Sequence, residues 1–78
     1  MRIQYSKQAV KFLKTQGVTV QARIQTAILK LPLGDVVKLK GQSNKYRLRV
    51  GDYRVIFTPT GEILYIEKID NRGQAYKK

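Results

Sequence analysis

The chain has neither cysteine nor histidine, and these two absences narrow its chemistry before any motif is considered. Without cysteine there is no disulfide and no thiolate metal site. Without histidine the chain lacks the commonest acid–base and metal-ligating side chain. Acidic residues are scarce too, and they are too scattered to form a metal cage: Asp35, Asp52, Glu62, Glu67 and Asp70. We therefore expect no metal and no other cofactor.

Long apolar stretches are also missing. No segment approaches the length of a membrane span, and the N-terminus lacks the apolar run of a secretory signal. We therefore expect a cytoplasmic protein without a membrane partner. The 78 residues suit one small domain, 1–78, near the lower limit for a self-sufficient core.

Positive charge dominates what is present. The chain carries 16 Lys and Arg against 5 Asp and Glu, a formal net charge of +11. A domain this basic usually meets nucleic acid, an anionic membrane or an acidic protein. Scattered lysines are more typical of a solvated surface, and we interpret four helix lysines in that way: Lys7, Lys11, Lys14 and Lys30.

Two helices are expected in the first half of the chain. Ser6 is a good N-cap for a helix over 7–16, and Gly17 is placed to end it in the left-handed conformation. Thr19 is placed to cap a second helix over 20–31. Because the connection is very short, the helices should form an antiparallel pair.

Three segments outside the helices carry weaker strand signals. Residues 1–5 alternate weakly and predict a short strand, whereas 35–41 is a loop or a short strand. Residues 62–70 form a nearly continuous apolar run, which is typical of a central strand. The register of this last strand stays open, because a slip of one residue exchanges its two faces.

The strongest local signal is a β-hairpin whose two alternating strands meet at a Gly-Asp turn, 51–52. This turn places Arg49 opposite Arg54. The other predicted pairs are Val50 with Tyr53, Leu48 with Val55, Arg47 with Ile56, and Tyr46 with Phe57.

The two faces of the hairpin differ sharply. One face collects apolar side chains for a core: Tyr46, Leu48, Val50, Tyr53, Val55 and Phe57. The other collects Lys45, Arg47, Arg49 and Arg54. Like charges placed opposite each other destabilise a sheet, so Arg49 against Arg54 is expected to be unfavourable without an internal benefit. A bound polyanion would relieve the repulsion, and a solvated sheet face is the plainer alternative.

These elements predict an α+β fold. Two N-terminal helices pack on one face of a small, mainly antiparallel four-stranded sheet, in the order strand, helix, helix and three strands. The first strand should join an edge of that sheet, and a short tail or turn of helix should end the chain.

The chain resembles the RelE/ParE superfamily of toxin–antitoxin proteins, and most closely its RelE-like branch. The resemblance is collinear over almost the whole chain. Its parts are "YSKQAVKFLK", "ILKLP", "KLKG", "YRLRVGDYRVIF" and the terminal "IDNRGQAY".

The resemblance implies a ribosome-dependent endoribonuclease that cuts messenger RNA in the ribosomal A site without a metal. In this reaction the ribose 2′-OH attacks the adjacent phosphate and expels the 5′-oxygen. The family also implies an acidic antitoxin as partner, in a toxin–antitoxin hetero-oligomer, and the net charge of +11 makes that partner electrostatically sensible.

The resemblance also implies roles for single residues. Arg54 would hold the scissile phosphate, while Arg47 and Arg49 would grip neighbouring phosphates or ribosomal RNA. Tyr76 would orient a base and share in proton transfer, and Arg72 matches a common basic position. The complete RNA-binding set is Lys45, Arg47, Arg49, Lys68 and Lys77.

Two departures from the family affect proton transfer. Arg47 and Arg49 stand where the RelE pattern has lysines, and arginine is not a practical base. Asp70 stands where a basic residue could act as general acid. Lys45, Lys68 and Tyr76 are the replacement candidates.

Two other functions therefore remain open. One is a ParE-like inhibitor of DNA gyrase, which would act by binding without RNA chemistry. The other is an inactive toxin fold that survives as an antitoxin-binding protein.

Overall fold

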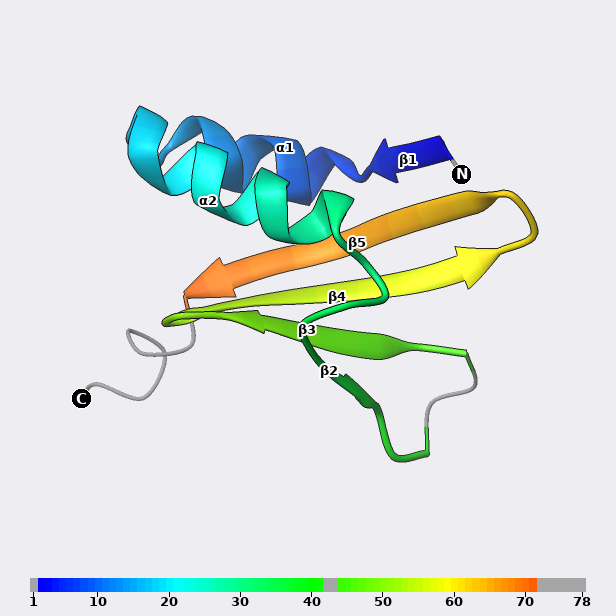
Figure 1. Ribbon diagram of the computed structural model, residues 1–78. Coiled ribbons are helices and arrows are strands. Elements are labelled where there is room, and N and C mark those ends of the chain that lie inside the picture. Colours follow the sequence, from blue (N-terminus) through cyan, green and yellow to red (C-terminus); the bar gives the residue numbers. More distant parts are fainter. Residues whose placement is uncertain (1, 42–43, 72–78) are drawn as a thin grey trace.

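The computed structural model describes residues 2–41 and 44–71, and these fold into two layers, a five-stranded sheet and a helix pair over one face (Figure 1). The elements are β1 (Arg2–Tyr5), α1 (Lys7–Lys14), α2 (Val18–Leu29), β2 (Asp35–Lys38), β3 (Tyr46–Val50), β4 (Tyr53–Thr60) and β5 (Ile63–Asn71). Within these described residues, neither helix is long and apolar enough to span a bilayer.

The strand order is β1-β5-β4-β3-β2. β1 lies parallel to β5 at one edge, and the other neighbours are antiparallel. The α+β class and the edge position of the first strand agree with the sequence, but the expected count of four strands is wrong and the sheet is mixed. The additional strand is β2, whose four residues are mostly exposed and so carry little apolar pattern.

The hairpin register is confirmed at all five predicted pairs, including Arg49 opposite Arg54. Gly51 takes a φ of 59°, a left-handed conformation that glycine adopts without strain. Leu48 and Val55 face the helices and are at most 1% exposed. The core therefore lies between the hairpin and the helix pair.

The helix connection differs from the prediction. Gly17 has a φ of −68° and is the N-cap of α2, so it is not left-handed, and Thr19 lies inside the helix rather than at its cap. The carbonyls that end α1 are met in another way: the Thr15 hydroxyl and amide donate to Phe12, and the Gln16 amide donates to Leu13. Both helices end two residues earlier than expected, and α2 begins two earlier.

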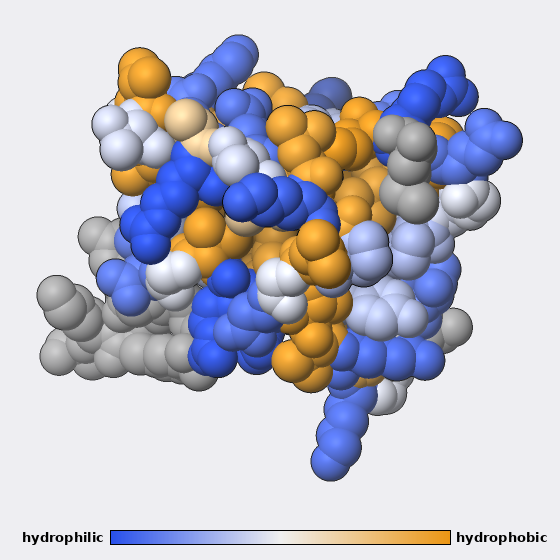
Figure 2. Space-filling view, in the orientation of Figure 1, coloured by the Kyte–Doolittle hydropathy of each residue, from blue (hydrophilic) through white to orange (hydrophobic). Residues whose placement is uncertain are grey.

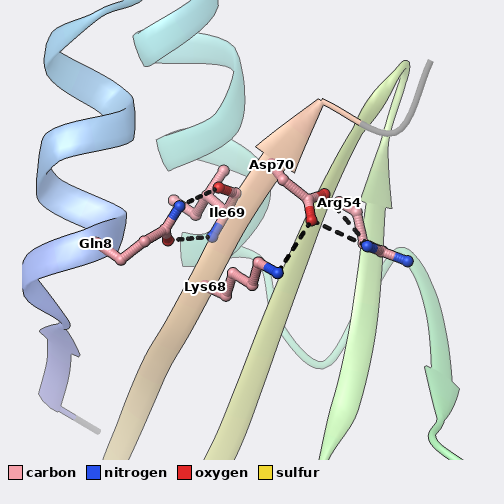
Figure 3. A network of polar contacts seen from close by, with 5 residues as sticks. All are labelled: Gln8, Arg54, Lys68, Ile69 and Asp70. Carbon is pink, nitrogen blue, oxygen red and sulfur yellow. Dashed lines mark hydrogen bonds and ion pairs between the residues drawn. The ribbon is translucent and has the colours of Figure 1, made fainter. Parts of the chain in front are cut away.

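The N-terminus of α1 secures the half of β5 that β1 does not reach. β1 pairs with β5 only as far as Ile66. Beyond it, the Ser6 hydroxyl donates to the Glu67 carbonyl at 2.6 Å. Gln8 then donates to the Ile69 carbonyl at 2.9 Å and accepts from the Ile69 amide at 3.0 Å, as a neighbouring strand would (Figure 3).

Replacing Gln8 with alanine should lower the free energy of unfolding by about 1–2 kcal/mol, because two backbone groups of Ile69 lose their partner. Urea denaturation followed by circular dichroism measures the change. Gln25→Ala, at an exposed site of α2, is the matched control and should change stability by less than about 0.5 kcal/mol. Equal values for the two variants would refute the role of Gln8.

Candidate nucleic-acid interface

Four charged residues form one straight row across the sheet face that the helices leave uncovered. The strand register aligns Asp35 of β2, Arg49 of β3, Arg54 of β4 and Asp70 of β5. Their neighbours Leu48, Val50 and Val55 are buried on the helix side, and side chains alternate along a strand. The row therefore belongs to the open face.

Each arginine of this row is paired with the carboxylate on its outer side. Arg49 Nε lies 2.9 Å from Asp35 Oδ2. Arg54 donates from Nη2 to Asp70 Oδ2 at 2.9 Å and from Nε to Asp70 Oδ1 at 3.3 Å (Figure 3). The expectation that the repulsion between the arginines has no internal relief is therefore wrong. The missing information was the position of the two acids.

The next row contains Val37, Arg47, Ile56 and Lys68. Arg47 lies in the middle of the face, with a side chain 21% exposed and its Nη2 3.9 Å from Asp35 Oδ1. Its Nε is buried and has no hydrogen-bond acceptor within residues 2–41 and 44–71. A buried donor of this kind would gain from an anion that reached it.

A third group surrounds Glu67, which is the extra residue of a β-bulge. Ile56 pairs with Lys68 while Phe57 pairs with Ile66, so Glu67 has no direct opposite. Its carboxylate accepts from Thr58 Oγ1 and lies 2.9 Å from Lys45 Nζ. These bonds, the Thr58 bond first, hold the pKa of Glu67 below its ordinary value.

The open face thus brings together five of the predicted site residues: Lys45, Arg47, Arg49, Arg54 and Lys68. The predictions for Arg72, Tyr76 and Lys77 lie outside the described residues. Within the described part of the chain, no cluster of three potential metal ligands of the His, Cys, Asp or Glu type occurs.

The acidic partners are what the sequence interpretation missed. Asp70 was considered only as a departure from a family pattern, and Asp35 and Glu67 were given no role. A signal for the bulge was available in the spacing of the buried residues Leu64, Ile66 and Ile69, which changes from two to three. That change moves Asp70 onto the face of Arg54.

A second surface feature is a groove of about 600 Å³ between α2 and β3. Its walls combine Leu33 and Leu48 with Arg23, Lys30 and Arg49. Figure 2 shows apolar side chains running from the helix layer toward the β2 side, with hydrophilic side chains on both flanks. The groove suits a partner that offers apolar groups together with carboxylates.

Glu67→Gln should reduce stability in a pH-dependent way. Because the folded-state pKa lies below the ordinary 4.5, the ionised carboxylate stabilises the fold fully above pH 4.5 and loses this effect as the pH falls through the folded-state value. The difference in unfolding free energy between wild type and Glu67→Gln should therefore be constant above about pH 5.5 and shrink below the unfolded-state pKa.

Urea denaturation at a series of pH values between about 3 and 7 measures this difference. Glu62→Gln removes one negative charge from an exposed position in the β4–β5 turn and is the matched control. A difference for Glu67→Gln that stays the same over this whole range would contradict the assignment.

Comparison with known proteins identifies the family. The chain is 31% identical to Toxin RelE3 of Methanocaldococcus jannaschii, over 97% of this chain and 96% of the relative. No family model matches. Two solved RelE chains in antitoxin–toxin complexes share the fold. The Methanococcus jannaschii RelE chain has a TM-score of 0.75 and 31% identity, with 94% of each chain covered.

The second solved chain comes from the RelE–RelB complex of Pyrococcus horikoshii, with a TM-score of 0.74, 30% identity and coverage of 94% of this chain and 96% of that one. The YoeB dimer of Staphylococcus aureus shares the fold at 19% identity, with a TM-score of 0.72, 87% of this chain and 92% of that chain covered. With close to a third of its residues identical along almost its full length, the chain belongs to the RelE family of toxins.

Proposed function

We propose that this chain is the toxin of a type II toxin–antitoxin pair and a metal-independent endoribonuclease that cuts messenger RNA in the ribosomal A site. The proposal takes residues 1–78 as one toxin domain that acts in the cytoplasm, where ribosomes work. The observation that carries it is the cationic open face of β3 and β4 in a chain of the RelE family.

Arg54 is the best-placed residue for the scissile phosphate. It lies on the central strand β4, and Arg49 and Arg47 flank it on β3. A guanidinium carries five donors in a planar fork that matches the oxygens of a phosphate, and Arg54 is held against Asp70 through Nε and Nη2. Extra negative charge develops on the phosphate as the 2′-oxygen attacks, so a fixed cation there stabilises the transition state more than the ground state.

The neighbouring cations extend the anion-binding face. Arg47 and Arg49 would contact phosphates on one side of the scissile group, while Lys45 and Lys68 would contact the strand farther along. Each is already close to a carboxylate, so RNA must compete with that carboxylate for the cation. Binding should therefore need several simultaneous phosphate contacts and depend strongly on salt.

The partner in this proposal is a cognate acidic antitoxin. The two solved archaeal relatives are RelE chains bound to RelB. The groove beside α2 combines apolar walls with Arg23 and Lys30, a surface chemistry that fits an amphipathic acidic segment. Antitoxin binding would also shield part of the charge of +11.

Arg54→Ala should lower the rate of messenger RNA cleavage by about 10²-fold or more, since the main cation facing the reacting phosphate is lost. Primer extension on messenger RNA from programmed ribosomes measures the cuts and their position relative to the A site. Arg2→Ala removes the same charge from the edge strand β1, two strands away from β4, and should cleave normally. Full activity of a folded Arg54→Ala would refute this role.

The ribosome assay, run together with a DNA supercoiling assay and an antitoxin-binding assay, separates the alternative functions. Inhibition of DNA supercoiling without ribosomal cuts would identify a gyrase inhibitor instead. Antitoxin binding without either activity would identify an inactive toxin fold.

A further inference from the structure

Cleavage by a ribose 2′-OH needs a group that accepts its proton, and the arginines of the open face are unsuited to that task. Resting on the proposed nuclease function, we propose that Asp70 is the general base. In this assignment one carboxylate both orients Arg54 and activates the nucleophile beside the phosphate that Arg54 binds.

Three carboxylates on the open face are available for comparison. Glu67 is bonded by Thr58 and Lys45, so it is held beside Lys45 and not beside Arg54. Asp35 lies on the edge strand β2 and bonds Arg49 of β3. It is therefore two strands away from Arg54. Asp70 alone among these three is bonded to Arg54 itself.

The geometry around Asp70 suits proton transfer. Its side chain is 23% exposed, so a substrate hydroxyl can reach it. Its two oxygens lie 2.9 and 3.3 Å from Arg54 nitrogens, and Lys68 Nζ lies 3.9 Å from Oδ2. A phosphate held by the same guanidinium would bring its adjacent 2′-oxygen toward the carboxylate, and a general base must come within about 2.6–3.2 Å of the group whose proton it takes.

The backbone next to Asp70 is also fixed by contacts on both sides of β5. The preceding residue, Ile69, is fully buried and has both backbone polar groups bonded by Gln8 (Figure 3). Asp70 itself is in register with Arg54 across the β4–β5 ladder. A base held on a strand by bonds on both sides needs little rearrangement before reaction.

An Asp70 oxygen takes the 2′-OH proton while the 2′-oxygen forms a bond to phosphorus, and Arg54 stabilises the resulting dianionic phosphorane. The bond from phosphorus to the 5′-oxygen then breaks, which leaves a 2′,3′-cyclic phosphate. Water protonates the departing 5′-oxygen, and the hydroxide so formed takes the proton from Asp70 and restores the carboxylate.

The test compares wild type, Asp70→Asn and Asp35→Asn in single-turnover cleavage on saturating programmed ribosomes, with ribosome affinity measured on the same preparations. Asp70→Asn should cleave about 10²-fold or more slowly, the size expected for loss of a general base. Its ribosome affinity should be unchanged or tighter, because a negative charge has left the RNA-binding face. Asp35→Asn, which removes the carboxylate at the other end of the row, should lose at least tenfold less activity.

Each result has one reading. Cleavage by Asp70→Asn at the wild-type rate or above it would overturn the assignment and make Asp70 a simple counterion. A parallel loss of affinity and rate would overturn it in favour of a purely positioning role. If the Asn variant does not fold, Asp70→Ala is assayed with and without added formate, which can replace a missing carboxylate base. Formate should then raise the cleavage rate. If the rate does not rise, the proposal is overturned. Failure of the wild type to cut would instead overturn the nuclease function itself.

Discussion

The register of β5 against β4 is the constraint on which the whole open face depends. Leu64 and Ile66 point into the core, and regular alternation would send Lys68 inward as well. The bulge at Glu67 shifts the phase by one residue, so Ile69 returns to the core while Lys68 and Asp70 face outward. One inserted residue thus sets both the hydrophobic packing of β5 and the carboxylate that meets Arg54.

This dependence separates what the sequence could predict from what it could not. The hairpin was predictable because a glycine turn and strict alternation specify register locally. The register of β5 depends on a bulge and on contacts with Ser6 and Gln8, about 60 residues away in the chain. β2 was ambiguous because an exposed edge strand needs only backbone partners, and these come from β3. The cationic side of the site was therefore accessible from sequence, but its acidic side was not.

The pairing of cations with acids changes the physical picture of RNA binding. If Arg49 and Arg54 had no acidic partners, they would attract any polyanion, and they would repel each other whenever no polyanion was bound. With Asp35 and Asp70 at its ends, the row is neutral in isolation and its side chains are held in place. Phosphates must then replace or share existing bonds, which lowers affinity for single anions and favours a strand that fills several positions together. The arginine side chains therefore lose their conformational entropy when the protein folds, and they lose little more when RNA binds.

The departures from the family pattern are easier to understand together than separately. Arg47 and Arg49 stand where the resemblance implies lysines, and arginine suits bidentate phosphate contacts but does not give up its proton. Asp70 introduces, in the same face, a group that can accept a proton, and it does so where β5 is held by Gln8 and where Arg54 lies opposite. A carboxylate at that position without Arg54 would repel the phosphate it has to approach. Bonded to Arg54, it can stay close to the reacting group. In the mechanism proposed above, Arg47 and Arg49 bind phosphates and the carboxylate of Asp70 accepts the proton, so the three departures belong to one arrangement.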